Sequence, residues 1–383
     1  MRVLILATDI YTRGGIARYT STLASALGGI IGPKNVHVLA LLNSGDCGEQ
    51  PDKFRILQAL SQRPAFTAKV RYSLQCLRVA RRKYDLIICS HVALSPIAAA
   101  IQRVFRTPFW VACHDAEVWN PVSFPVRMAL GRAQFVLPVS RFTAEKMREV
   151  NGIPREKLCL LFNAIPDAFS SMLLGEPDGS ESSEQRPTAS RIILSVGSLA
   201  RAHDYKGFDT VIRTLPYLLA EVPGLQYTIV GTGDNQMRME TLALQLGVRN
   251  RVTFAGRVSD SRLADLYRGC EVFVMPSRAL RRNGRWRGEG FGRVYAEAAL
   301  AGRPVVGSLA GGAAEAVLHQ KTGLLVDPDS ISDLSDALAT LLRDPKYAAK
   351  MGCEGRDWAK KIFRESSLRS SLVQVLQAGG YSL

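Results

Sequence analysis

Two glutamates stand eight residues apart in the segment GEGFGRVYAEAALAGRPVVG, which runs from Gly288 to Gly307. Glycines surround the first glutamate, Glu289, and alanines surround the second, Glu297. If a helix starts near Phe291, its first backbone amides lack partners within the helix and can bind an anion. Eight helical residues turn the chain by about 800°, so the two carboxylates would point in neighbouring directions. The segment therefore predicts a site where two carboxylates and free amides hold one extended, partly anionic ligand.

The amides expected to face this ligand are those of Phe291, Gly292 and Arg293. A second glycine segment, PVVGSLAGGAAEAV, follows and carries the pair Gly311 and Gly312. It would supply another set of free amides at the start of a helix. Glutamates at helical spacing usually face solvent, but glycine turns on both sides make a ligand site the better interpretation here.

Cations are expected beside the same ligand. The segment SVGSLARAHDYKGFD carries Arg201 and Lys206, which could neutralise a diphosphate, although two loop cations by themselves more often lie in solvent.

Gly15 follows the first apolar run and would open a helix that an anion can approach, unless it only forms a tight turn. His114 and His91 end two further apolar runs, where a lone histidine is more often a structural hydrogen-bonding group.

These candidates follow apolar runs that alternate with amphipathic helical segments, which is typical of parallel sheets covered by helices. The first half predicts the strands VLILAT, VHVLALL, DLIICS, FWVACH, FVLPVS and LCLLFN. The second half predicts the strands RIILSVG, LQYTIVG, RVTFAG, VFVMP, RPVVGS and GLLV. In open parallel sheets, ligands lie beyond the carboxyl ends of the strands, where the glycine segments fall. The predicted fold class is α/β, with two Rossmann-like doubly wound domains facing a central cleft.

The 383 residues exceed what one hydrophobic core usually sustains, so two domains of similar size are expected. Residues 1–174 form the predicted N-terminal domain and residues 191–356 the C-terminal domain. The polar segment 175–190, rich in Gly, Ser and Pro, is predicted to be the linker. Residues 357–383 predict a C-terminal helix that packs back toward the N-terminal domain.

The net charge of +15 is uneven, because the first 165 residues hold 22 Lys and Arg against 10 Asp and Glu. This balance suggests an anionic partner such as acidic lipid, a phosphorylated acceptor or nucleic acid, or merely a solvated basic surface. The basic helix expected over 69–83 either rests on an anionic membrane through Tyr72, Leu74, Leu77 and Val79 or packs on a sheet. Nucleic acid is disfavoured, because no helix-turn-helix signature or basic platform with interleaved aromatics appears.

Seven cysteines are scattered without CxxC spacing, which argues against a zinc ribbon and against a disulfide framework. No uncharged run is long enough to span a membrane, and Asp9 comes too early for a signal peptide. We therefore expect a cytoplasmic protein, with a peripheral place at the inner face of the membrane as a further option. No cofactor and no metal are expected; the one DxD sequence, Asp327 to Asp329, falls in a turn.

In order and separation, these segments resemble the retaining glycosyltransferases of family 4, which have the GT-B fold. Glu289 and Glu297 match the E-x7-E motif of that family, and DYKGFD matches its lysine loop. GRPVVGSLAGGAAEAV matches the double-glycine loop, and KTGLLVDPDS, GGIARYTSTLASAL and LLFNAIP match further family segments. Each motif is weak alone, but their combination is highly specific and covers nearly the whole chain.

The resemblance implies that residues 1–174 bind the acceptor and residues 191–356 bind the nucleotide-sugar donor. It implies that Lys206 neutralises the donor diphosphate and that Glu297 hydrogen-bonds the ribose hydroxyls. It also implies that Glu289, together with the amides that follow it, holds the transferred sugar and its phosphate.

The resemblance further implies that Gly15 approaches the phosphate and that His114 lies near the sugar and the acceptor. The family usually has arginine where this chain has Ser198, and Arg201 is a candidate substitute three residues later. Ala164 stands where the family has glycine at the end of the first domain, which affects only a turn.

Breaking a sugar–phosphate bond builds negative charge on the leaving diphosphate, which Lys206, Arg201 and the helix amides could stabilise without a metal. Together with the resemblance to family 4, this chemistry predicts a retaining, metal-independent hexosyltransferase that takes a GDP-sugar or UDP-sugar. Its acceptor would be a glycan or lipid-linked molecule of cell-envelope or exopolysaccharide synthesis. Two alternatives stay open: a nucleotide-sugar epimerase of the same fold, which needs no acceptor, and a non-catalytic nucleotide-sugar-binding protein.

Overall fold

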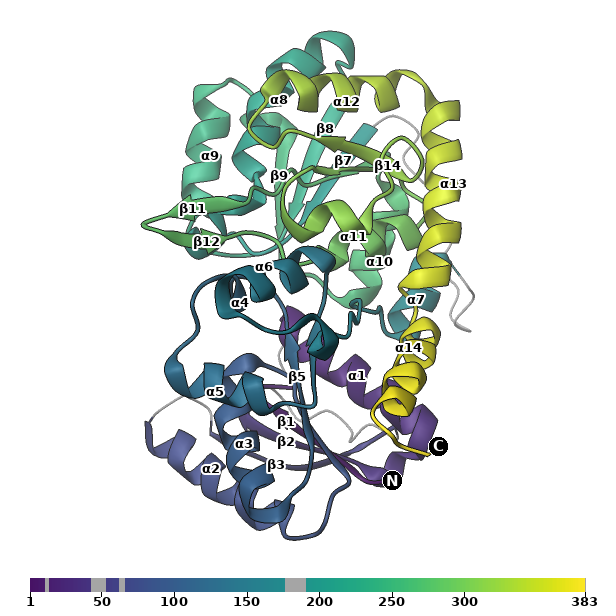
Figure 1. Cartoon of the computed structure of the whole chain (residues 1–383). Helices are drawn as coiled ribbons and strands as arrows, with labels where there is room; N and C mark the ends of the chain where they lie inside the picture. Colours follow the sequence, from purple (N-terminus) through teal and green to yellow (C-terminus); the bar gives the residue numbers. More distant parts are fainter. Residues whose placement is uncertain (11–13, 43–52, 62–65, 176–190, 383) are drawn as a thin grey trace. The chain divides into compact units, whose positions relative to one another are not determined.

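The computed structural model describes residues 1–10, 14–42, 53–61, 66–175 and 191–382 (Figure 1). Its contacts divide the chain into two compact units. The first unit comprises Met1–Ala164 and Glu365–Leu383, and the second comprises Ile165–Arg364. Each unit is built on a six-stranded sheet whose neighbouring strands are all parallel.

The sheet of the first unit has the strand order β3-β2-β1-β4-β5-β6. Its strands are β1 (Val3–Ala7), β2 (Val36–Leu42), β3 (Arg55–Ser61), β4 (Leu86–Cys89), β5 (Phe109–Cys113) and β6 (Phe135–Pro138). Its helices are α1 (Gly15–Ile31), α2 (Phe66–Ala80), α3 (Ser95–Phe105), α4 (Ala116–Trp119), α5 (Phe124–Arg132), α6 (Arg141–Asn151) and α14 (Glu365–Ala378). Short 3-10 helices are η1 (Pro33–Asn35), η2 (Val92–Leu94) and η3 (Arg155–Lys157).

The sheet of the second unit has the order β14-β13-β10-β7-β8-β9, and a separate hairpin joins β11 to β12. The strands are β7 (Arg191–Val196), β8 (Leu225–Val230), β9 (Val252–Gly256), β10 (Val272–Val274), β11 (Leu280–Arg282), β12 (Arg285–Arg287), β13 (Val305–Ser308) and β14 (Gly323–Val326). The helices are α7 (Asp167–Leu174), α8 (Phe208–Glu221), α9 (Gln236–Gln245), α10 (Asp260–Gly269), α11 (Arg293–Leu300), α12 (Ile331–Arg343) and α13 (Pro345–Ile362). The 3-10 helices are η4 (Arg201–Lys206), η5 (Arg249–Arg251) and η6 (Gly311–Ala316).

Both main sheets have the same topology, because in each the first strand of the unit lies in the middle and the chain then crosses to its other side. The crossing puts β1 beside β4 in the first unit and β7 beside β10 in the second. In open sheets of this kind, ligands bind outside the carboxyl ends of the strands at the point where the strand order reverses. Each unit therefore offers one such position. Gly15 follows β1 and Lys206 follows β7, whereas His114 follows the next strand, β5.

The central strands form where the sequence is continuously apolar, as a strand buried on both faces requires. All five residues of β1 are fully buried, and the same holds for β5. This confirms the predicted α/β class with two doubly wound parallel sheets. The expectation that the two domains face a central cleft stays a prediction.

In the first sheet, one predicted strand was wrong and one observed strand was not predicted. The run LCLLFN forms no strand in the described part of the chain, where Leu158 makes only an isolated bridge to Val136. The edge strand β3, with the sequence RILQALS, escaped prediction because Arg55, Gln58 and Ser61 interrupt its apolar residues. An edge strand tolerates such residues because it pairs on one side only, with β2.

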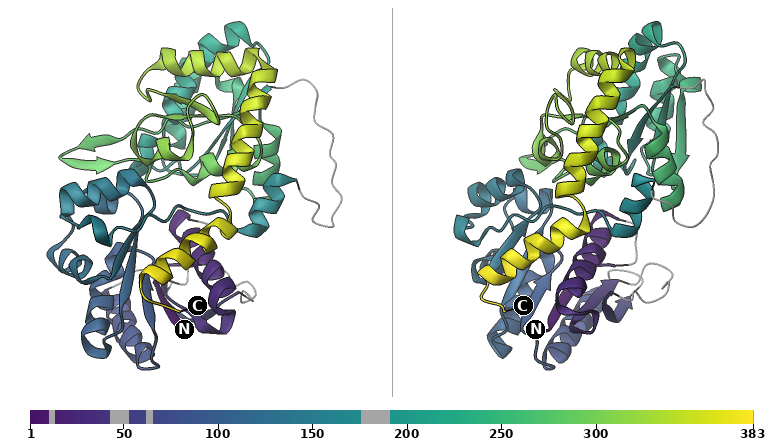
Figure 2. Two further views of the ribbon diagram at one scale, coloured as in Figure 1. Left: turned by 45° about the vertical axis from the view of Figure 1, so that its right-hand side comes forward. Right: turned by 90° about the vertical axis from the view of Figure 1, so that its right-hand side faces the viewer.

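The C-terminal end differs from the predicted single helix over 357–383. Residues 357–362 belong to α13 of the second unit. The helix ends there, and the non-helical residues Phe363 and Arg364 separate it from α14. Helix α14 belongs to the first unit and lies beside α1 (Figure 2). The buried carboxylate of Glu365 accepts a hydrogen bond from Ser25 Oγ at 2.7 Å, which fastens the start of α14 to α1.

The domain boundaries also differ from those expected. Helix α7 lies within the predicted range 1–174 but belongs to the second unit, where it packs on α10 and α11. The first segment of the first unit therefore ends at Ala164, ten residues before the predicted end of the N-terminal domain at residue 174. Of the predicted linker, residues 176–190 lie outside the described residues.

Candidate active site

Lys206 and Glu289 meet beyond the carboxyl ends of the strands of the second sheet. Lys206 ends η4, which follows β7, and its Nζ lies 2.6 Å from Glu289 Oε2. Both side chains are largely buried, with 12% and 16% of their surface exposed. A positive φ of 79° at Gly207 ends the lysine loop, and a Cβ there would lie 2.3 Å from the Pro276 carbonyl oxygen. Glycine at this position thus lets the loop approach the segment after β10.

The backbone around Glu289 is fixed by the second glycine segment. The Glu289 carbonyl oxygen accepts a hydrogen bond from the Gly312 amide at 3.1 Å. Helix α11 begins at Arg293, two residues after the predicted start near Phe291, and Glu289 lies just before the helix as expected. The relative direction of the Glu289 and Glu297 side chains was predicted from helical geometry. That geometry does not apply to Glu289, because this residue is not helical. Gly302, with a φ of 71°, follows the end of α11.

Glu297 lies inside α11 with 2% of its surface exposed. Tyr267 donates its hydroxyl hydrogen to Glu297 Oε2 at 2.9 Å, and Arg293 Nε donates to Oε1 at 3.0 Å. Burial raises the pKa of Tyr267 well above its usual value, and the negative charge of Glu297 raises it further, so the hydroxyl stays a donor. Both carboxylate oxygens thus already accept one bond, although each keeps a second lone pair.

The three residues predicted to present amides lie at the start of α11. Gly292, with a φ of 77°, is the N-cap, and a Cβ there would lie 2.4 Å from the Tyr295 ring. The Phe291 side chain is buried against Phe363, with ring centroids 5.4 Å apart, so only its backbone suits a ligand. The Arg293 guanidinium is held by Glu297. Contact of these amides with a ligand stays a prediction.

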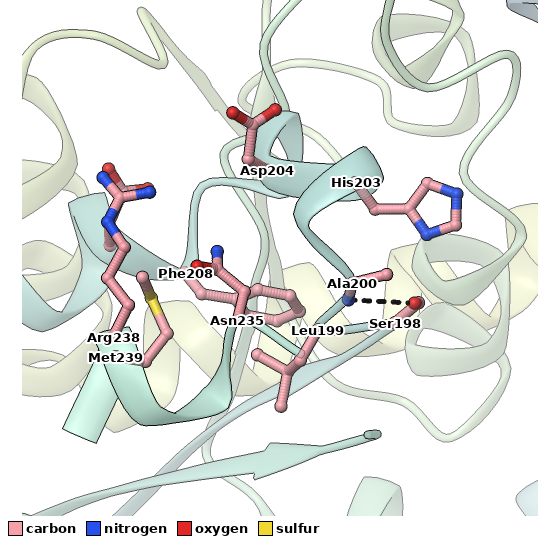
Figure 3. Close-up of a pocket in the computed structure, with 10 residues that line it drawn as sticks. Ser198, Leu199, Ala200, His203, Asp204, Phe208, Asn235, Arg238 and Met239 are labelled. Carbon is pink, nitrogen blue, oxygen red and sulfur yellow. Dashed lines mark hydrogen bonds between the residues drawn. The ribbon is translucent and has the colours of Figure 1, made fainter. Parts of the chain in front are cut away.

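Arg201 is not brought to the Lys206–Glu289 pair. Its side chain is 77% exposed, with Nε 4.0 Å from Asp234 Oδ2, and its amide donates to Asp234 Oδ1 at 2.8 Å. Figure 3 shows the neighbouring hollow, where Ser198 Oγ accepts a hydrogen bond from the Ala200 amide. The hollow is lined by Ser198, Leu199, Ala200, His203, Asp204, Phe208, Asp209, Asn235, Arg238 and Met239, but not by Lys206 or Glu289.

His203 escaped the sequence prediction although it lies three residues before Lys206. Its Nδ1 is buried and makes no hydrogen bond to any residue that the structure describes. Burial lowers the pKa of His203, the charge of Lys206 lowers it further, and Glu289 opposes this shift. A neutral imidazole therefore stands beside the ion pair. Its position near Lys206 was the only available sequence signal.

His114 follows β5 in the first unit and is buried. Its Nε2 lies 2.8 Å from the Ser90 carbonyl oxygen, which can only accept, so Nε2 carries a hydrogen and donates it to that oxygen. Tyr19 packs its ring edge-on at 4.7 Å, and the His91 ring is stacked at 6.4 Å. The structure thus brings both predicted histidines together beyond the ends of β4 and β5.

Glu117 holds the loop that carries His114, a role that sequence reasoning missed. Its carboxylate accepts the amides of His114 at 2.7 Å and Asp115 at 2.9 Å. Burial by itself would raise the pKa of Glu117, but the bond from Asp115 and the charge of His114 lower it to about 2. Among the described residues, no atom lies within 4 Å of the position that a Cβ of Gly15, the first residue of α1, would take.

The basic helix α2 packs on the sheet. Tyr72 is buried and donates a hydrogen bond to the Leu39 carbonyl oxygen at 2.9 Å, and Val79 is buried as well. These two residues cannot face a membrane as the alternative required, whereas Leu74 is 55% exposed. No helix within the described ranges is long and apolar enough to span a membrane.

Both aspartates of the DxD sequence after β14 bind other groups of the protein. Asp329 Oδ1 lies 2.8 Å from Arg278 Nε, and Asp327 accepts the Asp329 amide at 3.0 Å. Arg278 also pairs with Asp209 at 3.0 Å, so it ties this turn to α8. No cluster of three or more His, Cys, Asp or Glu suited to a metal occurs among the residues described. Cys47 lies outside the described residues, and the six described cysteines are free thiols.

Family models match both halves of the chain. Residues 14–164 match the model described as "Glycosyl transferase 4-like domain", and residues 180–358 match "Glycosyl transferases group 1". A GDP-mannose-dependent alpha-(1-6)-phosphatidylinositol monomannoside mannosyltransferase from Mycobacterium tuberculosis is 38% identical over 304 residues, covering 70% of this chain and 77% of the relative. The enzyme of the same description from Mycolicibacterium smegmatis is 34% identical, covering 74% of this chain and 72% of the relative.

Solved structures share the architecture at low sequence identity. Anabaena Alr3699/HepE in complex with UDP has a TM-score of 0.78 at 20% identity and covers 99% of this chain and 100% of its own. A glycosyltransferase from Rickettsia africae has a TM-score of 0.80 at 15% identity, with 98% of each chain covered. At these identities the likeness concerns the fold, which is that of the GT-B glycosyltransferases.

Proposed function

Because this chain belongs to the group 1 glycosyl transferases and has the GT-B fold of glycosyltransferases, we propose that it is a retaining mannosyltransferase using GDP-mannose. The acceptor is a glycolipid that bears a phosphodiester headgroup, by analogy with the phosphatidylinositol mannoside named for its relatives. Such an enzyme would work at the inner face of the cytoplasmic membrane in cell-envelope synthesis.

The observation that carries this proposal is the 2.6 Å pair of Lys206 and Glu289 beyond the carboxyl ends of the second sheet. Transfer leaves a diphosphate that gains negative charge as the bond to the sugar breaks. A largely buried ammonium stabilises that charge strongly, because water screens it little. In the free protein Glu289 is the counterion of Lys206; with donor bound, Lys206 would turn to the diphosphate and Glu289 would accept sugar hydroxyls.

The other residues have supporting roles in this proposal. The amides at the start of α11 face the diphosphate, and Glu297 accepts the ribose hydroxyls through its second lone pairs. Arg201 would have to leave Asp234 to reach a phosphate, so Lys206 is the principal cation. Gly15 would approach the phosphate, and His114, whose loop Glu117 holds, would lie near the sugar and the acceptor.

Thermal stability with different nucleotides tests the donor. We expect GDP-mannose and GDP to raise the Tm by several degrees, because a ligand at about 100 times its Kd adds about 2.7 kcal/mol to the stability of the folded state. UDP-glucose at the same concentration should change the Tm by less than about 1 °C. A shift with UDP-glucose alone would contradict the choice of GDP-mannose while leaving the family assignment intact.

Product analysis tests the reaction. With donor and a phosphatidylinositol-type acceptor, the product should carry an α-linked mannose, which the one-bond carbon–hydrogen coupling at the anomeric centre identifies. A β-linked product would contradict retention. Conversion of the donor without any acceptor would instead support the epimerase alternative, and nucleotide binding without turnover would support the non-catalytic one.

Chelation tests metal independence. Because Asp327 and Asp329 are engaged within their own turn and with Arg278, we expect EDTA to change the initial rate of transfer by less than about twofold. Adding magnesium or manganese should likewise leave the rate unchanged. A loss of activity on chelation that manganese restores would show that a metal takes part.

A further inference from the structure

The hairpin β11–β12 carries four arginines and no acidic residue. Its turn residues, Asn283 and Gly284, have φ values of 49° and 74°, as a two-residue hairpin turn with two positive φ angles requires. The hairpin projects from the body of the second unit in Figures 1 and 2. Arg287 is followed directly by Gly288 and Glu289, so the hairpin leads into the candidate active site.

The strand register gathers three of the arginines on one face. Arg282 stands directly opposite Arg285, and Leu280 stands opposite Arg287. Side chains alternate along each strand, so Arg282, Arg285 and Arg287 share a face. The other face presents Arg281, whose guanidinium carbon lies 5.9 Å from the centre of the Trp286 ring.

Of the three residues on this arginine face, Arg282 alone has a carboxylate partner among the described residues. Arg282 pairs with Asp204 at 2.8 Å, yet its side chain remains 62% exposed. Arg285 and Arg287 are exposed, and neither forms an ion pair with any described residue. Like charges held directly opposite across two strands destabilise the pairing. A hairpin of two three-residue strands is marginal by itself, so three arginines on one face do not serve its own stability.

We propose that this arginine face binds the phosphate groups of anionic lipid headgroups and so holds the active site of the second unit at a membrane surface. Guanidinium groups form paired hydrogen bonds to phosphate oxygens, and an arginine-rich arm with a tryptophan suits the boundary between headgroups and water. The inference rests on the proposed function, because a lipid-borne acceptor brings the enzyme to such a surface.

Vesicle co-sedimentation tests the inference with the full-length protein. The triple variant R282Q/R285Q/R287Q removes the three charges of the arginine face. The control K346Q/K350Q/K360Q removes three exposed charges of α13 in the same unit. Both are compared with the unaltered protein on phosphatidylcholine vesicles with and without phosphatidylglycerol. Circular dichroism and Tm confirm that both variants fold.

We expect the triple arginine variant to bind phosphatidylglycerol vesicles about 100-fold more weakly, because each arginine near an anionic surface contributes about fivefold. The lysine control should lose less than about threefold. Pure phosphatidylcholine should bind neither, and inorganic phosphate should compete only weakly with vesicles. Equal losses in both variants would reduce the effect to net charge and overturn the proposal, as would unchanged binding of the arginine variant.

Two further measurements separate this inference from rival explanations. Tighter binding of the unaltered protein to duplex RNA than to anionic vesicles would overturn a lipid partner. Transfer to a water-soluble headgroup acceptor should be unchanged in the arginine variant, since no surface is needed there. If the unaltered protein transfers no sugar to any acceptor yet binds vesicles through these arginines, the proposed function fails and the lipid site stands.

Discussion

Replacing Lys206 with alanine should lower kcat/KM for sugar transfer at least tenfold and toward about 100-fold, the loss typical of removing one donor aimed at developing charge. The reason is geometric. Lys206 is 12% exposed, and its ammonium lies 2.6 Å from Glu289, so no other cation of this loop takes its place. Arg201, the other loop cation, is 77% exposed and lies beside Asp234.

Charge and shape can be separated at this pair. Lys206→Arg keeps the charge and should retain more transfer than the alanine variant. Glu289→Gln keeps the shape but removes the counterion of Lys206, so GDP affinity should be unchanged or higher while kcat falls about tenfold through the lost sugar contact. Steady-state kinetics and calorimetric GDP binding give the two quantities independently.

The matched control is Lys346→Ala, which removes an exposed lysine from α13 in the same unit and should leave kcat/KM unchanged. Full transfer activity in a folded Lys206→Ala protein would remove the diphosphate role of this lysine. A fall in GDP affinity for Glu289→Gln would contradict the view that the carboxylate competes with the diphosphate for Lys206.

Glu297→Ala should lower both transfer and stability. The substitution leaves the Arg293 guanidinium and the buried Tyr267 hydroxyl without their acceptor. Removing one member of a buried ion pair costs about 3–5 kcal/mol, because the other charge stays buried. For a domain of this size, the Tm should fall by roughly 6–20 °C. Transfer, measured well below the lowered Tm, should fall at least about tenfold.

Conservative variants distinguish a structural role of Glu297 from a contact between Glu297 and the substrate. Tyr267→Phe removes one donor to Glu297 but leaves the carboxylate, so it should cost about 1–2 kcal/mol of stability while retaining most transfer. Glu297→Gln keeps the volume and weakens acceptance of the ribose hydroxyls, so it should raise the KM for the donor. Normal kinetics in Glu297→Gln would contradict the ribose contact, and an unchanged Tm in Glu297→Ala would contradict the buried network.

The central strands and both glycine segments were predictable from the sequence for a physical reason. Strands buried on both faces must be continuously apolar, so runs such as VLILA identify themselves. Residues that need a positive φ or a close backbone approach are mostly glycine, as Gly207 and Gly292 show. Edge strand β3 met neither condition, because Arg55, Gln58 and Ser61 interrupt its apolar residues.

The candidate site was predictable as a set of residues but not as a set of contacts. Lys206 and Glu289 are 83 positions apart, and they meet because β10 lies beside β7 in the sheet. Tyr267 was no candidate, since nothing near it in the sequence reveals that its hydroxyl faces Glu297. Arg201 lies in the same loop as Lys206, and its charge and position suggested a place beside the ligand, but its side chain is exposed.

The sequence by itself determined the α/β class, the positions of the central strands and the loops that hold the candidate residues. Those properties depend on local composition, that is, on which residues can be buried and which backbone angles they allow. Only the tertiary structure decided which charges meet, which carboxylate is already engaged, and where the arginines of the hairpin gather. Those properties depend on strand order and register, which arise from packing between residues far apart in the chain.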